Sequence, residues 1–143
     1  MKPRTRARSI ALQVLYEVDI ANHPPGDVFK SRLEETPLAD DLSEFTRKII
    51  FGVLPLTPDL DLIISKYAPE WPLEQIAAID RNILRIALWE FAVFHETPIK
   101  VAINEAVELA KLYGSDSASR FVNGVLGSLA DHRHEIQQSL QKA

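Results

Sequence analysis

The sequence predicts an all-α protein, a compact single-domain bundle of about seven helices. Apolar residues recur at steps of three and four along most of the chain, which is the spacing of one helix face. Prolines and glycines divide this pattern into segments of helical length, and the strict alternation of a β-strand is essentially absent. With 143 residues, of which 46% are hydrophobic, one domain over residues 1–143 is expected.

Two helical segments are predicted in the first 36 residues, separated by a stretch rich in proline and glycine. The spacing predicts a helix over residues 7–18, and the stretch ANHPPGD ends it because prolines and glycine cannot continue a helix. A short helical segment around Val28, Phe29 and Leu33 then stops before Pro37.

The middle of the chain predicts two further helices separated by proline. An apolar stripe over residues 42–53 is closed by Pro55. Thr57 and Pro58 are typical of a new helix start, with a capping hydroxyl followed by proline at the first helical position. That helix is expected to continue to Tyr67.

The C-terminal half predicts three more helices. Residues 76–87 belong to the most apolar region and are expected to form the central helix of the core. Thr97 and Pro98 repeat the start signal of a helix that stops at Gly114. The polar stretch SDS then caps a last helix, which carries its apolar residues over 121–129.

Positive charge is concentrated at the N-terminus of an acidic chain. Lys2, Arg4, Arg6 and Arg8 carry +4, whereas the whole chain carries −4, so the remaining 135 residues carry −8. Such a patch attracts polyanions while the rest repels them. A frayed or extended arm would present the three arginines to a phosphate backbone. The alternative is a solubilising, poorly ordered terminus.

Composition argues against several classes of protein. The chain has no cysteine, and therefore no disulfide or thiolate metal site, which suits a cytoplasmic location. No run approaches the roughly 18 apolar residues of a membrane helix. His132 and His134 are two apart and point to different sides of a helix, so no metal pair is expected. The sequence contains no glycine-rich phosphate loop, and no other residue pattern in it demands catalysis, so we expect no catalytic residues, no metal and no cofactor.

The stretch LYGSDSASRFVNGVLG is the strongest candidate for a binding site outside the N-terminus. The start of a helix beside Arg120, with Ser117 and Asn123, offers an anion and base-edge site. Tyr113 or Phe121 adds a face on which an unpaired base can stack. The ordinary alternatives are that Phe121 belongs to the core and Arg120 is a solvated surface charge.

Four segments resemble the transcription antitermination factor NusB family. KVAINEAVELAKLYG followed by RFVNGVLGSLA is similar to its C-terminal half, IDRNILRIALWEF to its central helix, and RARSIALQVLYEVDI to its first helix. The resemblance runs from about Lys2 to Leu129, except for residues 22–41. It implies an all-helical RNA-binding protein that is not an enzyme.

The resemblance also implies partners. Members of the family pair with the ribosomal protein NusE, bind the single-stranded boxA element of nascent rRNA transcripts, and promote read-through by RNA polymerase together with NusA and NusG. Both monomers and homodimers occur in the family, so a homodimer is possible here. The implied NusE contacts are Tyr16, Glu74 and Asp80. The implied RNA contacts are Lys2, Arg4, Arg6, Arg8, Lys111, Tyr113, Ser117, Arg120, Phe121 and Asn123.

Two alternative functions stay open at this point. A similar helical domain occurs at the N-terminus of a bacterial rRNA cytosine methyltransferase, but that enzyme needs a long additional α/β domain, for which 143 residues leave no room. The other alternative is an interaction protein that uses its basic N-terminus only for solubility.

Overall fold

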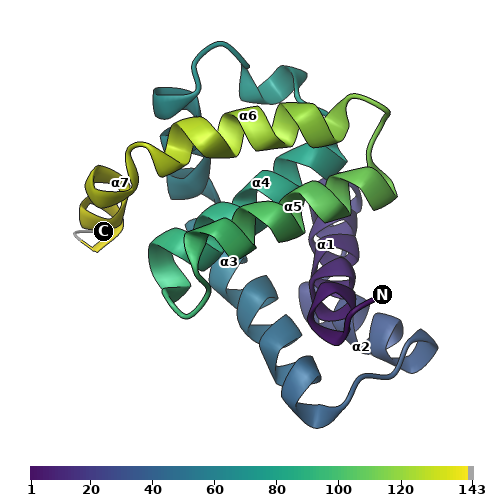
Figure 1. The fold of residues 1–143 in the computed structure, drawn as a ribbon. Helices are drawn as coiled ribbons and strands as arrows, with labels where there is room; N and C mark the ends of the chain where they lie inside the picture. Colours follow the sequence, from purple (N-terminus) through teal and green to yellow (C-terminus); the bar gives the residue numbers. More distant parts are fainter. Residues whose placement is uncertain (142–143) are drawn as a thin grey trace.

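A computed structural model describes residues 1–141 and confirms the all-α class. Within these residues there are seven α-helices and no strand, together with one short 3-10 helix (η1) and one π-helical turn (η2) (Figure 1). In chain order the elements are α1 (Pro3–Ala21), α2 (Pro25–Glu35), α3 (Asp40–Tyr67), η1 (Leu73–Gln75), α4 (Ala78–Trp89), η2 (Glu90–Phe94), α5 (Ile99–Tyr113), α6 (Ala118–Ala130) and α7 (Arg133–Gln141).

Helix α4 is the centre of the bundle, as the sequence predicted. It packs against α1, α3, α5 and α6, and in Figure 1 it lies behind α5. Ile83, Leu84 and Leu88 on this helix are fully buried. Because neighbours surround α4, its position fixes where α1, α5 and α6 present their outer faces.

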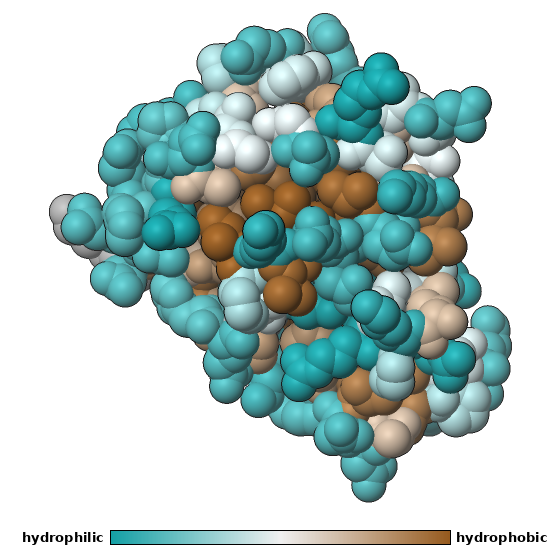
Figure 2. Space-filling view, viewed as in Figure 1, coloured by the Kyte–Doolittle hydropathy of each residue, from teal (hydrophilic) through white to brown (hydrophobic). Residues whose placement is uncertain are grey.

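The face of the molecule drawn in Figure 2 is mainly hydrophilic, with an apolar band and a smaller apolar group below it. Figure 2 shows this band across the middle of the viewed face, at the height of α5. Val101 and Leu112 on α5 are among the exposed apolar side chains. Within residues 1–141 we find no helix with the length and hydrophobicity needed to cross a bilayer.

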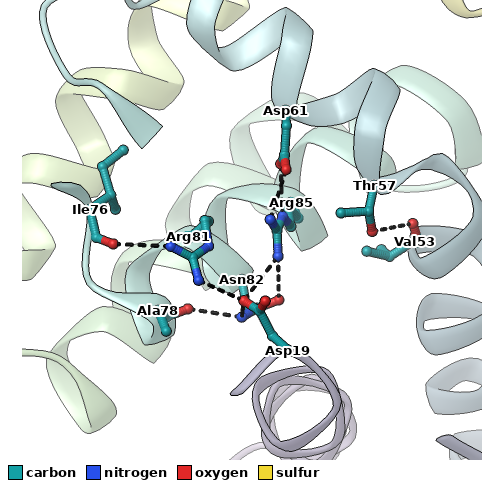
Figure 3. Close-up of polar contacts among 9 residues, drawn as sticks. All are labelled: Asp19, Val53, Thr57, Asp61, Ile76, Ala78, Arg81, Asn82 and Arg85. Carbon is teal, nitrogen blue, oxygen red and sulfur yellow. Dashed lines mark hydrogen bonds and ion pairs between the residues drawn. The ribbon is translucent and has the colours of Figure 1, made fainter. Parts of the chain in front are cut away.

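Helix α3 contradicts the predicted break at Pro55. It continues through Pro55 and Pro58 for 28 residues. Both prolines are exposed, so the carbonyl groups that lose their N–H partners face solvent and the helix can continue. The hydroxyl of Thr57 bonds the carbonyl of Val53 at 3.0 Å within the helix, and so does not cap a new one (Figure 3).

The predicted number of helices is confirmed, but two of the predicted helices do not exist as separate helices and one observed helix was not predicted. Two predicted helices are the single helix α3, and α7 was not predicted. The predicted capping bonds are also absent at α5 and α6, whose N-cap residues Pro98 and Ser117 form no side-chain capping bond. The hydroxyl of Thr97 instead bonds Glu90 at 2.9 Å.

A polar network joins α1, α3 and α4 (Figure 3). Asp19 at the end of α1 accepts hydrogen bonds from Arg81 at 2.9 Å, Asn82 at 3.0 Å and Arg85 at 3.2 Å. Arg85 also donates two bonds of 2.8 Å to Asp61 on α3. Partial burial by itself would raise the pKa of the Asp19 carboxyl, but these donors and the charge on Arg85 hold that pKa below its ordinary value.

Replacing Asp19 by asparagine should therefore destabilise the protein in a pH-dependent way. A lowered pKa means that the carboxylate contributes stability above its ordinary pKa of 3.8, and that this contribution is lost as the pH falls through the folded-state value. We expect Asp19→Asn to lower the free energy of unfolding by about 1–2 kcal/mol at neutral pH. Urea titrations at neutral and acidic pH measure this difference, which should shrink as the pH falls below the ordinary pKa of 3.8.

Asp27→Asn is the matched control, because Asp27 is an exposed acid in the first turn of α2. It should leave the free energy of unfolding nearly unchanged at both pH values. An Asp19→Asn deficit of equal size at acidic and neutral pH would contradict the account.

Candidate RNA and partner interface

One face of α1 carries several of the predicted contact residues. Steps of three and four place four residues on one side of the helix, namely Arg6, Ser9, Gln13 and Tyr16. Lys2 precedes them as the N-cap residue of α1. Lys2 and Arg6 are exposed, and Tyr16 is half-buried. This face therefore runs from two cations at the beginning of α1 to an aromatic ring near its end.

The end of α5 is fixed against this face by Tyr113. Its hydroxyl shares a hydrogen bond with the hydroxyl of Ser9 and accepts a second one from the amide of Gln13 at 3.2 Å. The Tyr113 side chain remains 38% exposed, and Lys111 in the same last turn is exposed. The structure thus brings the cations at the beginning of α1 and an accessible aromatic ring to one surface.

Arg8 occupies a different environment, in the interior. It is only 3% exposed, and its guanidinium forms two hydrogen bonds with Glu90, at 2.9 and 2.8 Å, and one with Glu105 at 2.7 Å. Thr5 and Thr97 complete the network by donating to Glu105 at 2.7 Å and to Glu90 at 2.9 Å. Burial opposes the charge on Arg8, but the bonds and charges of both glutamates outweigh it and raise the pKa of Arg8.

The prediction of an extended arm that presents all three arginines is therefore wrong. Helix α1 begins at Pro3, and in a helix alternate residues point to different sides. Arg4 is exposed, but its guanidinium lies 4.6 Å from the ring centroid of Phe45. Arg4 also borders a cleft that contains Asp41, Glu44 and Glu96. Of the three arginines, only Arg6 shares the face of Lys2 and Ser9.

A second group of predicted residues surrounds a cavity of about 290 Å³ between η1 and the beginning of α6. Trp71 packs against Phe121 edge to face, with ring centroids 5.5 Å apart. Phe121 and Ser117, predicted for RNA, thus lie beside Asp80, predicted for the partner. The lining residues are Glu70, Trp71, Pro72, Gln75, Ile76, Ala77, Asp80, Ser117, Ala118 and Phe121.

Asp80 is the unusual group of this cavity. It is only 8% exposed, and its Oδ1 atom has no hydrogen-bond partner among the described residues. Burial raises the pKa of its carboxyl. Gly114 permits the close approach of α6 here, because a Cβ atom on it would lie 2.4 Å from the Ala118 side chain and 3.1 Å from Asp80 Oδ1.

The remaining predicted residues lie outside these two groups. Arg120 and Asn123 are exposed on α6, and Glu74 is exposed in η1, next to Gln75 of the cavity wall. No set of three or more side chains that could hold a metal ion occurs in the described part of the chain.

Sequence reasoning missed Ser9, Gln13 and Trp71. The spacing of Ser9 and Gln13 from Arg6 was a usable signal, since three positions at steps of three and four share a helix face. Trp71 lies outside any apolar repeat, so no periodic pattern could assign it to a cavity.

The fold and these surfaces define a small all-α protein with two candidate binding surfaces. Exposed cations lie beside the end of α5 on one of them. The other is the cavity lined by Trp71, Phe121 and Asp80. The model of the NusB family matches residues 5–131. This chain therefore belongs to the NusB family.

The similarity between this chain and its relatives extends over most of both chains. The chain is 50% identical to the transcription antitermination protein NusB of Roseiflexus castenholzii, over 92% of this chain and 94% of the relative. Among solved structures, NusB of T. maritima is similar with a TM-score of 0.84 and 32% identity, over 92% of this chain and 93% of that one. A crystal structure of the antitermination factors NusB and NusE in complex with dsRNA contains a chain that is similar with a TM-score of 0.81 and 29% identity, over 90% of this chain and 96% of that one.

Removing the Arg8 side chain should destabilise the fold far more than removing its exposed neighbour. Arg8→Ala leaves Glu90 buried without its cation, for which we expect a loss of about 3–5 kcal/mol in the free energy of unfolding. Arg6→Ala should change this quantity by no more than about 0.5 kcal/mol. Urea unfolding followed by circular dichroism measures both, and equal losses would contradict the assignment of Arg8 to the interior.

Asp80→Asn should stabilise the protein at neutral pH. A carboxyl whose pKa is raised by folding favours the protonated form in the folded state, so stability is lost as the pH rises from the ordinary pKa of 3.8 through the folded-state value. The gain should disappear below the ordinary pKa of 3.8, where both states hold the proton. Thermal unfolding at several pH values tests this, with the exposed Glu74→Gln as control. A neutral-pH gain that persists unchanged in acid would refute the explanation.

Proposed function

We propose that this chain is a transcription antitermination factor that binds single-stranded boxA RNA of nascent rRNA transcripts together with the ribosomal protein NusE. The observation that carries the proposal is the likeness of the chain, over 90% of its length, to a chain of a NusB and NusE complex with double-stranded RNA. The exposed cations at the beginning of α1, beside the end of α5, support RNA as the ligand.

In this proposal the cations supply affinity and the aromatic rings supply preference for unpaired bases. Four exposed cations would neutralise phosphates along the strand, namely Lys2, Arg6, Lys111 and Arg120. The ring of Tyr113 is accessible and would stack on a base. Asn123, exposed on α6, would contact base edges through its amide.

The protein partner would occupy the neighbouring surface. Tyr16 continues the face of α1 beyond Gln13, and Glu74 is exposed beside the cavity that contains Asp80. The 135 residues after the basic start carry a net −8, which suits a basic ribosomal protein. The resulting pair would join NusA, NusG and RNA polymerase and promote read-through of terminators.

The combined variant Lys2→Ala/Arg6→Ala/Arg120→Ala should weaken RNA binding and flatten its salt dependence. Each lost contact with single-stranded phosphate should reduce the slope of log K against log salt by about 0.7. Arg8 is excluded from the variant because it is buried. The measurement is fluorescence anisotropy of a labelled boxA RNA with the chain and NusE, across a salt series.

Lys30→Ala/Lys48→Ala/Lys100→Ala is the matched control, because it removes three exposed cations from α2, α3 and α5. The control should keep the slope of the unsubstituted chain. Scrambled single-stranded RNA and a duplex serve as competitors. The proposal fails if boxA is not preferred over the scrambled RNA in the presence of NusE, or if both triple variants change the slope equally.

A further inference from the structure

The side-chain oxygen of Gln13 is a free hydrogen-bond acceptor beside an exposed aromatic ring. The amide nitrogen of this side chain, Nε2, donates to the hydroxyl of Tyr113 at 3.2 Å and to the hydroxyl of Ser9 at 3.3 Å. Among the described residues the oxygen, Oε1, has no donor, yet it is not enclosed by protein as Asp80 Oδ1 is. A ligand from solvent can therefore donate to it.

The hydrogen bonds of the nitrogen set the direction of this oxygen. In a planar side-chain amide the nitrogen and the oxygen lie on different branches, and the nitrogen donates whereas the oxygen only accepts. With Nε2 turned toward Ser9 and Tyr113, Oε1 is turned away from them. Ser9 is only 3% exposed, and its hydroxyl also shares a hydrogen bond with that of Tyr113. Gln13 thus presents an acceptor that two neighbours hold in place.

The ring of Tyr113 is the group that would bring an RNA base to this acceptor. Its side chain is 38% exposed, and aromatic rings stack on unpaired bases with little preference among them. Gln13 bonds the hydroxyl at the edge of the ring, so a base stacked on that ring would place its own edge near Oε1. Arg6 is exposed on the same face of α1, about two helical turns earlier, where it can neutralise a phosphate of the same strand.

A fixed acceptor distinguishes cytosine from uracil. These two bases have rings of the same size, but cytosine carries an amino group where uracil carries a carbonyl oxygen. The amino group can donate to Gln13 Oε1, whereas the carbonyl oxygen would face a second acceptor with no hydrogen between them. Hydrogen bonds to the exposed edges of unpaired bases are the usual way in which proteins recognise the sequence of single-stranded RNA.

We propose that Gln13 is a specificity-determining residue, which selects cytosine over uracil for the base that stacks on Tyr113. Ser9 and the hydroxyl of Tyr113 are positioning groups that orient its amide. This inference rests on the proposed function for the presence of single-stranded RNA on this face of α1. It gives Tyr113 two separable roles, because the ring binds the base and the hydroxyl orients the side chain that recognises it.

The test compares RNAs that differ in one base. Fluorescence anisotropy measures the affinity of the chain with NusE for a labelled boxA RNA in which each pyrimidine is exchanged in turn between cytosine and uracil. We expect one position at which cytosine binds about tenfold more tightly than uracil. Oligocytidine and oligouridine added to the chain alone give the same comparison without boxA and without NusE.

Variants of the network separate base selection from stacking. Gln13→Met keeps the length of the side chain without its polar groups, and should bring the affinities for cytosine and uracil at that position to within about twofold. Tyr113→Phe keeps the ring and should retain most of the affinity while the cytosine preference falls, and Ser9→Ala should act in the same direction. Tyr113→Leu removes the ring and should weaken the binding of both RNAs about tenfold or more.

The matched control is Gln138→Met, because Gln138 is an exposed glutamine on α7. It should change neither the affinities nor their ratio. The ratio is the decisive quantity, since a variant that merely loosens the fold lowers the affinity for both RNAs together. Circular dichroism of each variant verifies that its helix content is that of the unsubstituted chain.

The outcomes separate this inference from the proposed function. A preference for uracil at the position that depends on Gln13, or a cytosine preference that survives Gln13→Met, would overturn the selection by Gln13. A preference that Tyr113→Phe leaves unchanged would overturn the positioning role of the hydroxyl. If the chain prefers oligocytidine in a Gln13-dependent way but does not prefer boxA with NusE, the inference stands and the proposed function fails. If no RNA binds, both fail.

Discussion

The ion pair between Arg8 and Glu90 is the interaction on which the arrangement of both surfaces depends. It joins α1 to the start of η2, directly after α4, through two hydrogen bonds of 2.8 and 2.9 Å, in an interior where both side chains are at most 3% exposed. Glu105 extends the network to α5. Buried charges are tolerated only when they are paired, so the three helices are held in one relative position. That position turns Lys2 and Arg6 toward solvent on the side where α5 ends.

The same constraint explains how an acidic protein can offer a restricted cationic surface. Four cations begin the chain, but the interior takes one and the ring of Phe45 holds another beside acidic side chains. The two that remain lie on the face that continues to Tyr113. The cavity between η1 and α6 has the opposite charge, because carboxylates and aromatic rings line it without any cation. Oppositely charged surfaces therefore lie on one molecule, and in our proposals each takes a different partner.

Much of the fold could be predicted from sequence because apolar spacing reports directly on buried helix faces. The central position of α4 and the helices α5 and α6 followed from that pattern. The break at Pro55 was wrong because an exposed proline can distort a helix without ending it, when the carbonyl group that loses its N–H partner faces solvent. Helix α7 was missed because Ile136 is its only fully buried residue.

The candidate site was less accessible to sequence reasoning. The charge of Arg8 is visible in the sequence, but its partners are 82 and 97 positions away, and only the packing of helices brings them together. Trp71 and Asp80 meet at a cavity for the same reason. The family resemblance named residues on both surfaces, but it could not separate the buried arginine from the exposed one.

The most direct test of this account is to follow the Nε–H resonances of the arginine side chains by NMR while single-stranded boxA RNA is added to the chain with NusE. We expect the resonances of Arg6 and Arg120 to shift with RNA, while the Arg8 resonance keeps its position, because Glu90 and Glu105 hold it in the interior. A shift of Arg8 as large as that of Arg6, or an Arg6 resonance that ignores RNA, would contradict the division of the basic N-terminus into a structural cation and a binding cation.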